Sequence, residues 1–265
     1  MAKLQGEVVF TGTLGDLSAY RMRGVDRIIV RRKGGPSKKK IKSHPNFDLV
    51  RRNNSEFGGR ATAAKWIMRG LHIVKRLGDY NISGPLNALM KPVQRLSHGT
   101  LGQRDVLLSK NIKILEGFSF NKNVPFDAVV RIPIACVIDR ANRSVKLEIP
   151  ALLPAINLFT PKSNPIYAIT VSLSAIPDIK YNNDLGYGVA RPYDLLKTWA
   201  SFTTDWYPII KGSPNTTVEL ALPHAMPDND FSLMVAIGIC YGQMEDVTTV
   251  KQVKNAGSAK VLAMG

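Results

Sequence analysis

The chain is poor in the residues on which several classes of protein depend. Its 265 residues include only two cysteines, Cys136 and Cys240, which are too few for a disulfide framework or a cysteine-only zinc site. We therefore expect both to be buried free thiols. No run of eighteen apolar residues occurs, and the N-terminal residues contain no apolar signal core. We expect no membrane span and no classical secretion, which leaves the cytoplasm or a released assembly.

Recognisable catalytic patterns are also missing. The four histidines, His44, His72, His98 and His224, show none of the spacings that bind metals. A Gly-x-Ser-x-Gly nucleophile motif is absent. The glycine-rich stretch 34–38 contains a proline and lacks the Gly-Lys-Ser/Thr ending of a phosphate loop, so it reads as a turn. We predict a non-enzymatic protein without a cofactor or a metal.

Acidic residues are scarce in the first part of the chain. The whole sequence has 36 Lys and Arg against 20 Asp and Glu, a net charge of +16. Residues 1–110 hold 22 of these cations and 7 of the acids, a net +15, whereas residues 111–265 hold 14 and 13, a net +1. A charge of one sign concentrated on one region attracts a polyanion or an acidic partner. We therefore predict a basic region at 1–110 and a nearly neutral domain at 111–265.

The first 42 residues read as a small sheet followed by a loop. Strands are expected at 8–10, 17–22 and 27–32, with glycine-containing turns at 11–16 and 24–26. Such a three-stranded meander needs a packing partner for independent stability. Gly34 to Ser37 break the sheet, and we expect residues 38–42 to form a short cationic loop.

A long helical pattern follows the basic loop. Pro45 is suited to a helix start, and the pattern runs to about Leu77, a rod of about 48 Å. The expected apolar seam consists of Phe47, Val50, Asn54, Phe57, Ala61, Ala64, Met68 and Leu71. Gly58 and Gly59 predict a kink or two helices in close contact. A second helix is expected from Pro85 to Ser97.

Short alternating runs replace the helical pattern after Gly102. They predict strands at 128–134, 135–138, 145–149, 167–173, 218–222, 233–241, 247–253 and 260–264. Turn residues separate these runs, and the gaps leave no room for repeated crossover helices. The predicted fold class is α+β: an N-terminal β-meander and helices followed by an antiparallel β-sandwich.

Five segments carry a resemblance to a known family. They are Gly12 to Tyr20, Val30 to Gly35, Arg52 to Gly58, Gly102 to Arg104, and Leu115 to Asn121. In order and spacing the chain resembles, over roughly residues 5–160, a family of Bacteroidetes proteins that has no assigned activity. The resemblance implies the layout of hairpin, helices and β-domain, and it implies no catalytic function. Members are often less basic after Gly35, so the triplet Lys38 to Lys40 departs from the family.

The basic residues of the first region form the candidate site. On an ideal helix, Arg51, Lys65, Arg69 and Arg76 fall within about 40° of one another, beside the apolar seam. Trp66 points away from the seam, which suits either a stacking contact or interface or a second buried face. The predicted nucleic-acid-binding residues are Arg21, Arg23, Arg27, Arg31, Arg32, Lys33, Lys38, Lys39, Lys40, Lys42, Arg51, Arg52, Lys65, Arg69 and Arg76. Without interleaved aromatic residues, this pattern predicts phosphate contact and no base reading.

These observations predict a structural protein that self-associates and contacts nucleic acid backbone through residues 21–76. Strands of the meander or residues 260–264 would add to a neighbour's sheet. One alternative is a phage-like shell or appendage subunit without nucleic acid, whose basic face meets an acidic neighbour. Another is a β-sandwich recognition module with an exposed aromatic platform formed by Trp199, Trp206 or Tyr207.

Overall fold

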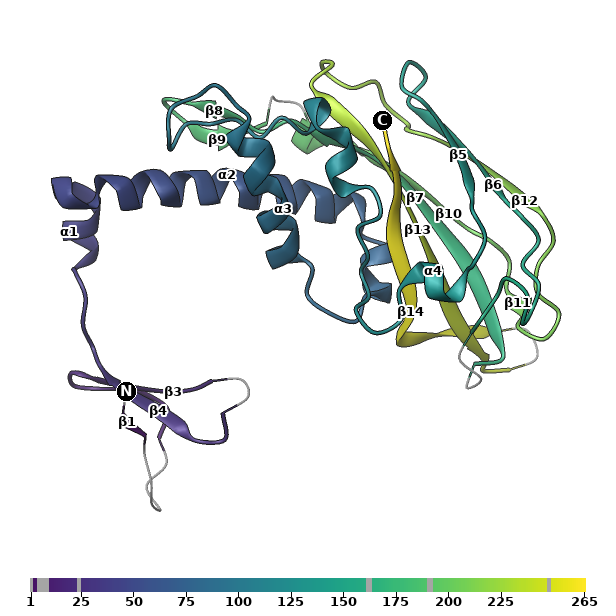
Figure 1. Cartoon of the computed structure of the whole chain (residues 1–265), viewed down its shortest axis with the longest axis horizontal. Helices are drawn as coiled ribbons and strands as arrows, with labels where there is room; N and C mark the ends of the chain where they lie inside the picture. Colours follow the sequence, from purple (N-terminus) through teal and green to yellow (C-terminus); the bar gives the residue numbers. More distant parts are fainter. Residues whose placement is uncertain (1, 4–9, 23–24, 161–163, 190–192, 247–248) are drawn as a thin grey trace. The chain divides into compact units, whose positions relative to one another are not determined.

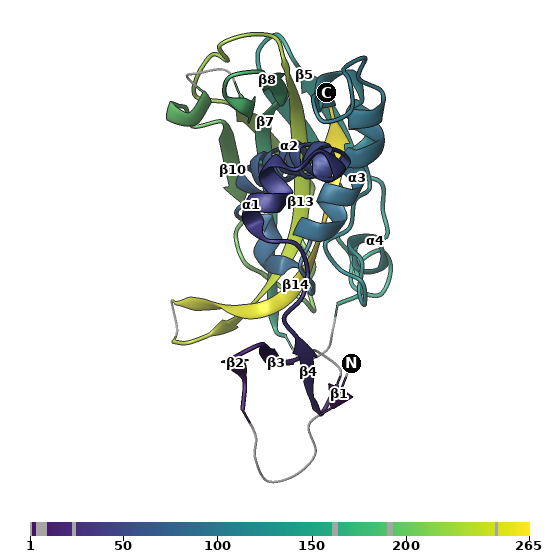
Figure 2. The same cartoon turned by 90° about the vertical axis from the view of Figure 1, so that its left-hand side faces the viewer.

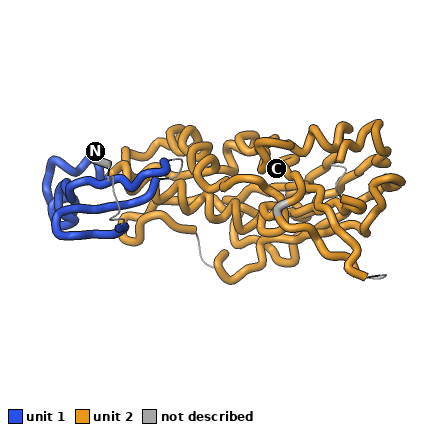
Figure 3. Tube along the Cα trace, turned by 90° about the horizontal axis from the view of Figure 1, so that it is seen from below, with its two compact units in different colours: residues 1–51 blue, residues 52–265 orange. Residues whose placement is uncertain are grey.

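The chain forms two compact units, residues 1–51 and residues 52–265, which Figure 3 distinguishes by colour. The structure is a computed structural model that describes residues 2–3, 10–22, 25–160, 164–189, 193–246 and 249–265. Each unit has its own cluster of buried apolar side chains. The units are therefore separate cores joined through one helix, α2.

The first unit contains a small antiparallel sheet. Its strands, in the spatial order β1-β4-β3-β2, are β1 (Ala2–Lys3), β2 (Gly12–Leu14), β3 (Leu17–Arg21) and β4 (Ile28–Arg32). The expected turn at 11–16 is shorter than predicted, because Gly12–Leu14 pairs as a strand and only Gly15 and Asp16 turn. Gly15 has a φ of +53°, a conformation that glycine adopts without strain. Residues 8 and 9 of the predicted first strand lie outside the described residues.

The basic segment after the sheet is a helix, which corrects the expectation of a loop. Helix α1 (Lys38–Ser43) begins at Ser37, whose Oγ accepts a hydrogen bond from the Lys40 N–H at 3.2 Å. Ser37 is therefore the N-cap of α1. A 3₁₀ turn, η1 (Pro45–Phe47), then leads into α2.

Helix α2 (Asp48–Gly70) is one continuous helix without the expected kink (Figure 1). Gly59 permits close packing: a Cβ at this position would lie 2.7 Å from the Tyr187 ring. The buried face of α2 differs from the predicted seam, because it includes Glu56, Gly59, Ala63, Trp66 and Ile67. The helix ends before the predicted limit, at a turn that precedes η2 (Val74–Leu77).

The remaining helical segments of the second unit are short. Helix α3 occupies nearly the predicted range, starting two residues earlier and ending at Arg95. These segments are α3 (Ser83–Arg95), η3 (Leu108–Lys110), η4 (Ile112–Leu115), α4 (Phe126–Val129) and η5 (Tyr193–Leu195). The predicted strand at 128–134 is wrong, because α4 and a single bridge at Val130 occupy its first half.

A five-stranded antiparallel sheet forms the centre of the second unit. Its main order is β10-β7-β13-β14, and β11 pairs with the other end of β7. The strands are β7 (Ile166–Pro177), β10 (Trp199–Thr203), β11 (Tyr207–Pro208), β13 (Phe231–Met244) and β14 (Val250–Met264). Every residue of β7 is buried, which indicates that both faces of the sheet are covered.

Sheet and helices cover opposite faces of this central sheet (Figures 1 and 2). Helices α2 and α3 lie on one side, and a sheet of order β12-β6-β5 lies on the other. Its strands are β5 (Ala135–Asp139), β6 (Ser144–Ile149) and β12 (Thr216–Ala221). In β6, Val145, Leu147 and Ile149 are buried while Lys146 and Glu148 are exposed, the alternation of a one-sided sheet. The predicted β-sandwich is thus part of a three-layer unit.

Small residues let α2 approach the central sheet closely. Ser172 and Ser174 of β7 face the helix, and the Ser172 hydroxyl donates to the Gly70 carbonyl at 2.7 Å. Gly238 of β13 lies under Leu77 on the same face. The opposite face of these strands carries larger apolar side chains, such as Val171. One face of these strands therefore packs closely against a helix through small residues, whereas the other face packs through larger apolar side chains.

The C-terminal strand is already paired within its own chain. β14 pairs with β13 on one side. On its other edge, the N–H groups of Gly117 and Phe120 donate to the carbonyls of Val261 and Ala259, and the Val261 N–H donates to the Phe118 carbonyl. Residues 260–264 are therefore not a free strand for a neighbour, contrary to one expectation. A separate hairpin, β8 (Lys180–Asn182) and β9 (Gly186–Gly188), packs beside α2.

The fold is α+β, with N-terminal strands and helices followed by a large antiparallel sheet region, as the sequence predicts. The predicted domain boundary at 110 does not coincide with the division between the units. Ile67 and Leu71 of the helical region belong to the same core cluster as the strands after 111. Helices 52–95 thus form a layer of the sandwich unit.

Candidate nucleic-acid interface

The first unit carries a large excess of positive charge. Residues 1–51 contain 12 Lys and Arg against 4 Asp and Glu, a net charge of +8. The charge excess of the predicted basic region is thus densest in its first half. The described cations fall into two groups, on α1 and on the small sheet.

The four lysines of α1, Lys38, Lys39, Lys40 and Lys42, are all exposed. Among the described residues, none of their ammonium groups has a carboxylate within 4 Å. Lys38 and Lys39 lie in the first turn of α1, where the positive end of the helix dipole repels cations, and no acidic residue lies there. This short helix therefore concentrates positive charge without local compensation.

The arginines of the small sheet are divided between its two faces. Arg21 and Arg32 share the face of Ala19 and Val30, whereas Arg31 points to the other face and lies 5.5 Å from the Tyr20 ring. Arg32 pairs with Asp16 at 3.7 Å, with both side chains exposed. The sheet thus supplies charge on both sides and no single flat basic surface.

Three further predicted cations lie close in sequence to the strands of the small sheet. Arg27 and Lys33 are exposed on the segments flanking β4, and Arg23 lies outside the described residues. The backbone N–H of Lys33 donates a hydrogen bond to the Asp16 carbonyl, and the Lys33 side chain is exposed to solvent. Both described cations are therefore positioned for contact with an anion.

Arg51 and Arg52 are structural as well as charged. Arg51 donates hydrogen bonds to the carbonyls of Ile41 at 2.9 Å and His44 at 3.0 Å, which closes the C-terminal end of α1, and it also pairs with Asp48. Arg52 belongs to the second unit and packs its Cβ against Gly102. Arg51 is thus committed to holding the lysine helix in place.

The predicted stripe on the long helix is only partly available. Lys65 and Arg76 are exposed, but Arg69 donates to the Leu196 carbonyl at 3.2 Å and lies 4.8 Å from the Trp66 ring. Trp66 is only 6% exposed and packs edge-to-face on Tyr193, with ring centroids 6.3 Å apart. The alternative of a second buried face is therefore correct for Trp66, and the proposed stacking or interface role is wrong.

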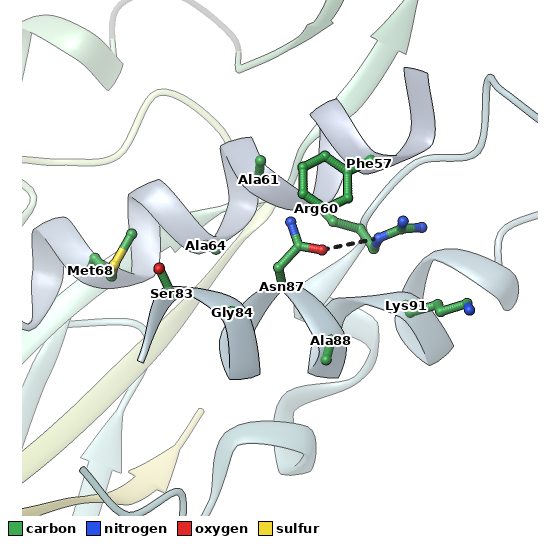
Figure 4. A pocket seen from close by; sticks show the side chains of 10 residues that line it. All are labelled: Phe57, Arg60, Ala61, Ala64, Met68, Ser83, Gly84, Asn87, Ala88 and Lys91. Atoms are coloured by element: carbon green, nitrogen blue, oxygen red, sulfur yellow. Dashed lines mark hydrogen bonds between the residues drawn. The ribbon is translucent and has the colours of Figure 1, made fainter. Parts of the chain in front are cut away.

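Only part of the predicted apolar seam lines an open groove. Figure 4 shows Phe57, Ala61, Ala64 and Met68 of α2 facing α3 across a cavity of about 540 Å³. Phe57 is 57% exposed, whereas Ala64 and Leu71 are buried in the core of the second unit. The seam therefore contributes to the core only at some of its positions.

A buried polar cluster near the middle of α2 was missed by sequence reasoning. Glu56 is buried and lies 3.9 Å from Arg60 and 3.6 Å from Arg104. Gln94 accepts from Arg60 at 2.9 Å, and its amide donates to the Arg104 carbonyl and the Tyr187 hydroxyl. Burial, with Glu56 next, raises the pKa of Tyr187 to about 12.

This polar cluster joins two of the segments that carry the family resemblance. The Ser55 hydroxyl donates to the Gly102 carbonyl at 2.7 Å, and the Gly102 N–H donates to Glu56 at 3.1 Å. These segments therefore act here as a structural clasp between α2 and the loop after α3. The pairing of an Arg with a Glu far apart in sequence gives no local signal.

The search for a metal site is negative among the described residues. No three His, Cys, Asp or Glu side chains converge there as metal ligands. Cys136 and Cys240 are free, half-buried and buried respectively, and burial raises the pKa of the Cys136 thiol to about 11. At that pKa the thiol is protonated near neutral pH, so it is a poor nucleophile.

The suggested aromatic platform does not form an exposed surface. Trp199 is half-buried between His72 and Lys197, and Trp206 lies against Gly242. Tyr207 is half-buried beside Tyr167, with ring centroids 6.0 Å apart. These three side chains fill space within the second unit.

Most exposed cations of the candidate site belong to the first unit, and the second unit separately exposes Lys65 and Arg76. Across the described segments, no helix has both the length and the apolar character needed to cross a bilayer. A scan against protein-family models, a search of curated proteins and a search of solved structures each found no match to this chain.

Proposed function

We propose that this protein is a non-enzymatic structural protein that self-associates and binds the phosphate backbone of nucleic acid through its first unit. The observation that carries the proposal is helix α1, whose four lysines are exposed and have no carboxylate partner among the described residues. Bringing a polyanion to these lysines relieves their mutual repulsion and releases its condensed counterions.

The arrangement favours backbone contact over base reading. The lysines project in several directions around a short helix, and no exposed aromatic side chain is interleaved with them. Single ammonium groups bind phosphate as point charges, without the paired hydrogen bonds that identify a base. We therefore expect binding that is insensitive to sequence.

Salt dependence tests this function directly. About eight exposed cations of the first unit are free of carboxylates and backbone acceptors among the described residues: Arg21, Arg27, Arg31, Lys33, Lys38, Lys39, Lys40 and Lys42. If all contact duplex DNA, a plot of log affinity against log salt has a slope of about −7. Fluorescence anisotropy with a labelled duplex measures it. Absence of binding at low salt, or binding that ignores salt, contradicts the proposal.

A matched pair of triple variants localises the contact. Replacing Lys38, Lys39 and Lys40 by glutamine should reduce the magnitude of the slope by about 3, at about 0.9 per phosphate. Replacing the exposed Lys110, Lys113 and Lys211 of the second unit removes the same charge and should leave the slope unchanged. Equal loss in both variants would mean that net charge alone attracts the DNA. Loss in neither would exclude α1 as the binding site.

Self-association is supported by the weak core of the first unit. Its buried cluster consists of Ala19, Ile28 and Val30 with Phe10 packed against them, while Leu14 is 65% exposed. A sheet with so little buried apolar area gains stability when a second copy covers it. Light scattering after size-exclusion chromatography, before and after nuclease treatment, should show an oligomer in both samples. Collapse to monomer after nuclease would mean that nucleic acid alone holds the copies together.

A single surface change tests the role of the small sheet in assembly. Leu14→Ser removes an exposed apolar side chain at the sheet edge and should shift the oligomer towards monomer at a given concentration. Leu185→Ser, at a still more exposed position of the second unit, is the control. Unchanged association in Leu14→Ser would place the contact elsewhere.

A further inference from the structure

A second concentration of uncompensated positive charge lies on the second unit, around His72. Lys75 and Arg76 of η2 and Lys197, just before β10, all act electrostatically on the His72 ring. Arg76 also lines a cavity of about 410 Å³ together with Gln252, Val253 and Lys254. The three cations that act on His72 thus come from two separate parts of the chain.

No carboxylate balances these cations within the part of the chain that the structure describes. Lys75, Arg76, Lys197 and Lys254 are exposed, and none forms an ion pair with a described residue. The nearby Lys251, by contrast, pairs with Glu245 at 2.9 Å. Other exposed cations of this unit, such as Lys91 and Arg95, also lack a carboxylate, but only here, among the described residues, do three cations act on one histidine ring.

Packing holds the cluster in a fixed geometry. The His72 ring lies 3.8 Å from the Trp199 ring, and the Lys197 ammonium lies 4.4 Å from the same ring. Trp199 pairs with Ser174 of β7, against which the end of α2 is packed at Gly70. The site is therefore built on the central sheet and needs no loop rearrangement to bring its cations together.

The His72 ring itself has an unused polar atom. Its Nδ1 is buried and has no hydrogen-bond partner in the described structure. Burial lowers the pKa of His72, and the charges of Arg76, Lys75 and Lys197 lower it further, against an interaction with the Arg69 backbone carbonyl that raises it. The ring is consequently neutral near pH 7, although cations surround it.

We propose that Lys75, Arg76 and Lys197, beside His72, form a binding site for phosphate groups. Arg76 supplies a planar donor fork that matches phosphate oxygens, and the two lysines supply charge without imposing a fixed direction. The shared chemistry is a phosphate ester, whether in nucleic acid backbone or in a free nucleotide. This site is separate from the lysine helix and stands whether or not the first unit binds nucleic acid.

His72 provides the readout, because it lies within the field of all three cations. A phosphate bound there offsets their repulsion, so the pKa of His72 should rise by about 1 on saturation. Nuclear magnetic resonance follows the ring in the full chain, and a His72→Gln variant assigns its signal among the four histidines. Titrations use inorganic phosphate, a nucleoside monophosphate and a short single-stranded oligonucleotide in separate samples.

The three ligands distinguish the sources of the phosphate. A rise with phosphate and nucleotide assigns a small-molecule site, whereas a rise with the oligonucleotide alone assigns a backbone site. The double variant Arg76→Gln/Lys197→Gln should weaken binding by about ten-fold or more. It should also raise the pKa of His72 in the absence of ligand, since two repelling charges are gone.

The control replaces the same charges outside the cluster. Lys91→Gln/Arg95→Gln on α3 removes two exposed cations and should leave the phosphate affinity and the pKa of His72 unchanged. The proposal is overturned if none of the three ligands moves the His72 pKa at low salt. It is equally overturned if the cluster variant binds phosphate as well as the parent protein does.

Discussion

Two neighbouring glycines on α2 show how much depends on single residues. At Gly58 an added Cβ would meet nothing within 4 Å, whereas at Gly59 it would lie 2.7 Å from the Tyr187 ring. The sequence predicts the importance of this dipeptide but assigns it to a kink or to a close contact between two helices. The close approach that explains Gly59 involves a residue 128 positions later, so no local pattern reveals it.

These glycines give a matched pair of predictions. Gly58→Ala should stabilise the chain by about 1 kcal/mol, because alanine loses less backbone entropy in a helix. Gly59→Ala should destabilise it by about 2 kcal/mol, because the new methyl group overlaps the half-buried Tyr187 ring. Urea unfolding of both variants measures the difference. Equal effects would contradict the packing of α2 on the β8–β9 hairpin.

His72 gives a pH-dependent contribution to stability. Its folded-state pKa is lowered, first by burial and then by Arg76, Lys75 and Lys197, so the unfolded state binds the proton first as the pH falls. The contribution is fully present above about 6.5, the ordinary pKa of histidine, and is lost on acidification through the window between that value and the folded pKa. Urea unfolding in buffer without phosphate should show a steeper loss for the parent chain than for His72→Gln. Parallel curves would rule out this residue as the cause.

At the scale of elements, the sequence predicts where helices occur better than it predicts which face of each helix is buried. The ranges of α2 and α3 agree with the periodic pattern, but the seam of Phe57, Ala61 and Met68 points into an open groove. The buried face of α2 includes Glu56, whose negative charge is neutralised by Arg60 and Arg104. A hydrophobicity pattern cannot identify a buried carboxylate, since one compensating cation, Arg60, is local but the other, Arg104, comes from a distant part of the sequence.

Removing that carboxylate should be costly. Glu56→Gln leaves Arg60 and Arg104 without their counter-charge in a largely buried site, and we expect a loss of about 3 kcal/mol in unfolding free energy. Glu219→Gln breaks an exposed pair with Lys146 and should cost less than about 1 kcal/mol. Chemical denaturation compares them. A similar cost for the two would mean that the Glu56 cluster is solvated.

Helix α1 illustrates a conflict between local stability and binding. Lys38 and Lys39 occupy the turn where acidic residues are favoured. Replacing both with glutamate should therefore raise the thermal midpoint of the first unit at low salt while it weakens DNA binding. Circular dichroism and anisotropy measure the two effects on the same samples. A variant that loses stability together with binding would contradict this account.

At the scale of the molecule, the sequence predicts the α+β class but not the partition of the chain. Charge content places a boundary near residue 110, whereas the cores divide between Arg51 and Arg52. The reason is that charge describes surfaces, and α2 and α3 carry basic residues on their outer side while their inner side packs on the sheet. The division of the chain into two units therefore follows the buried side chains and not the surface charge.

The separate cores predict that the second unit folds alone. A chain of residues 52–265 retains every residue of the large buried cluster and should unfold cooperatively within a few degrees of the corresponding transition in the full chain. It should also lose most of the salt-dependent DNA affinity. Calorimetry and anisotropy test the two statements independently. A truncated chain without a cooperative transition would show that the first unit contributes to the second core.

The covered edge of β14 has a consequence for the time course of biosynthesis. Asn121 bonds to Gly257 and Ala259, and Glu116 accepts from the Met264 N–H, so these contacts join partners more than 130 positions apart. Since a ribosome makes the chain in order, β14 can pair with β13 and with the segment at 116–121 only after the last residues have been made. The cationic first unit emerges long before that moment. The proposed binding of an anionic partner can therefore begin while the central sheet is still incomplete.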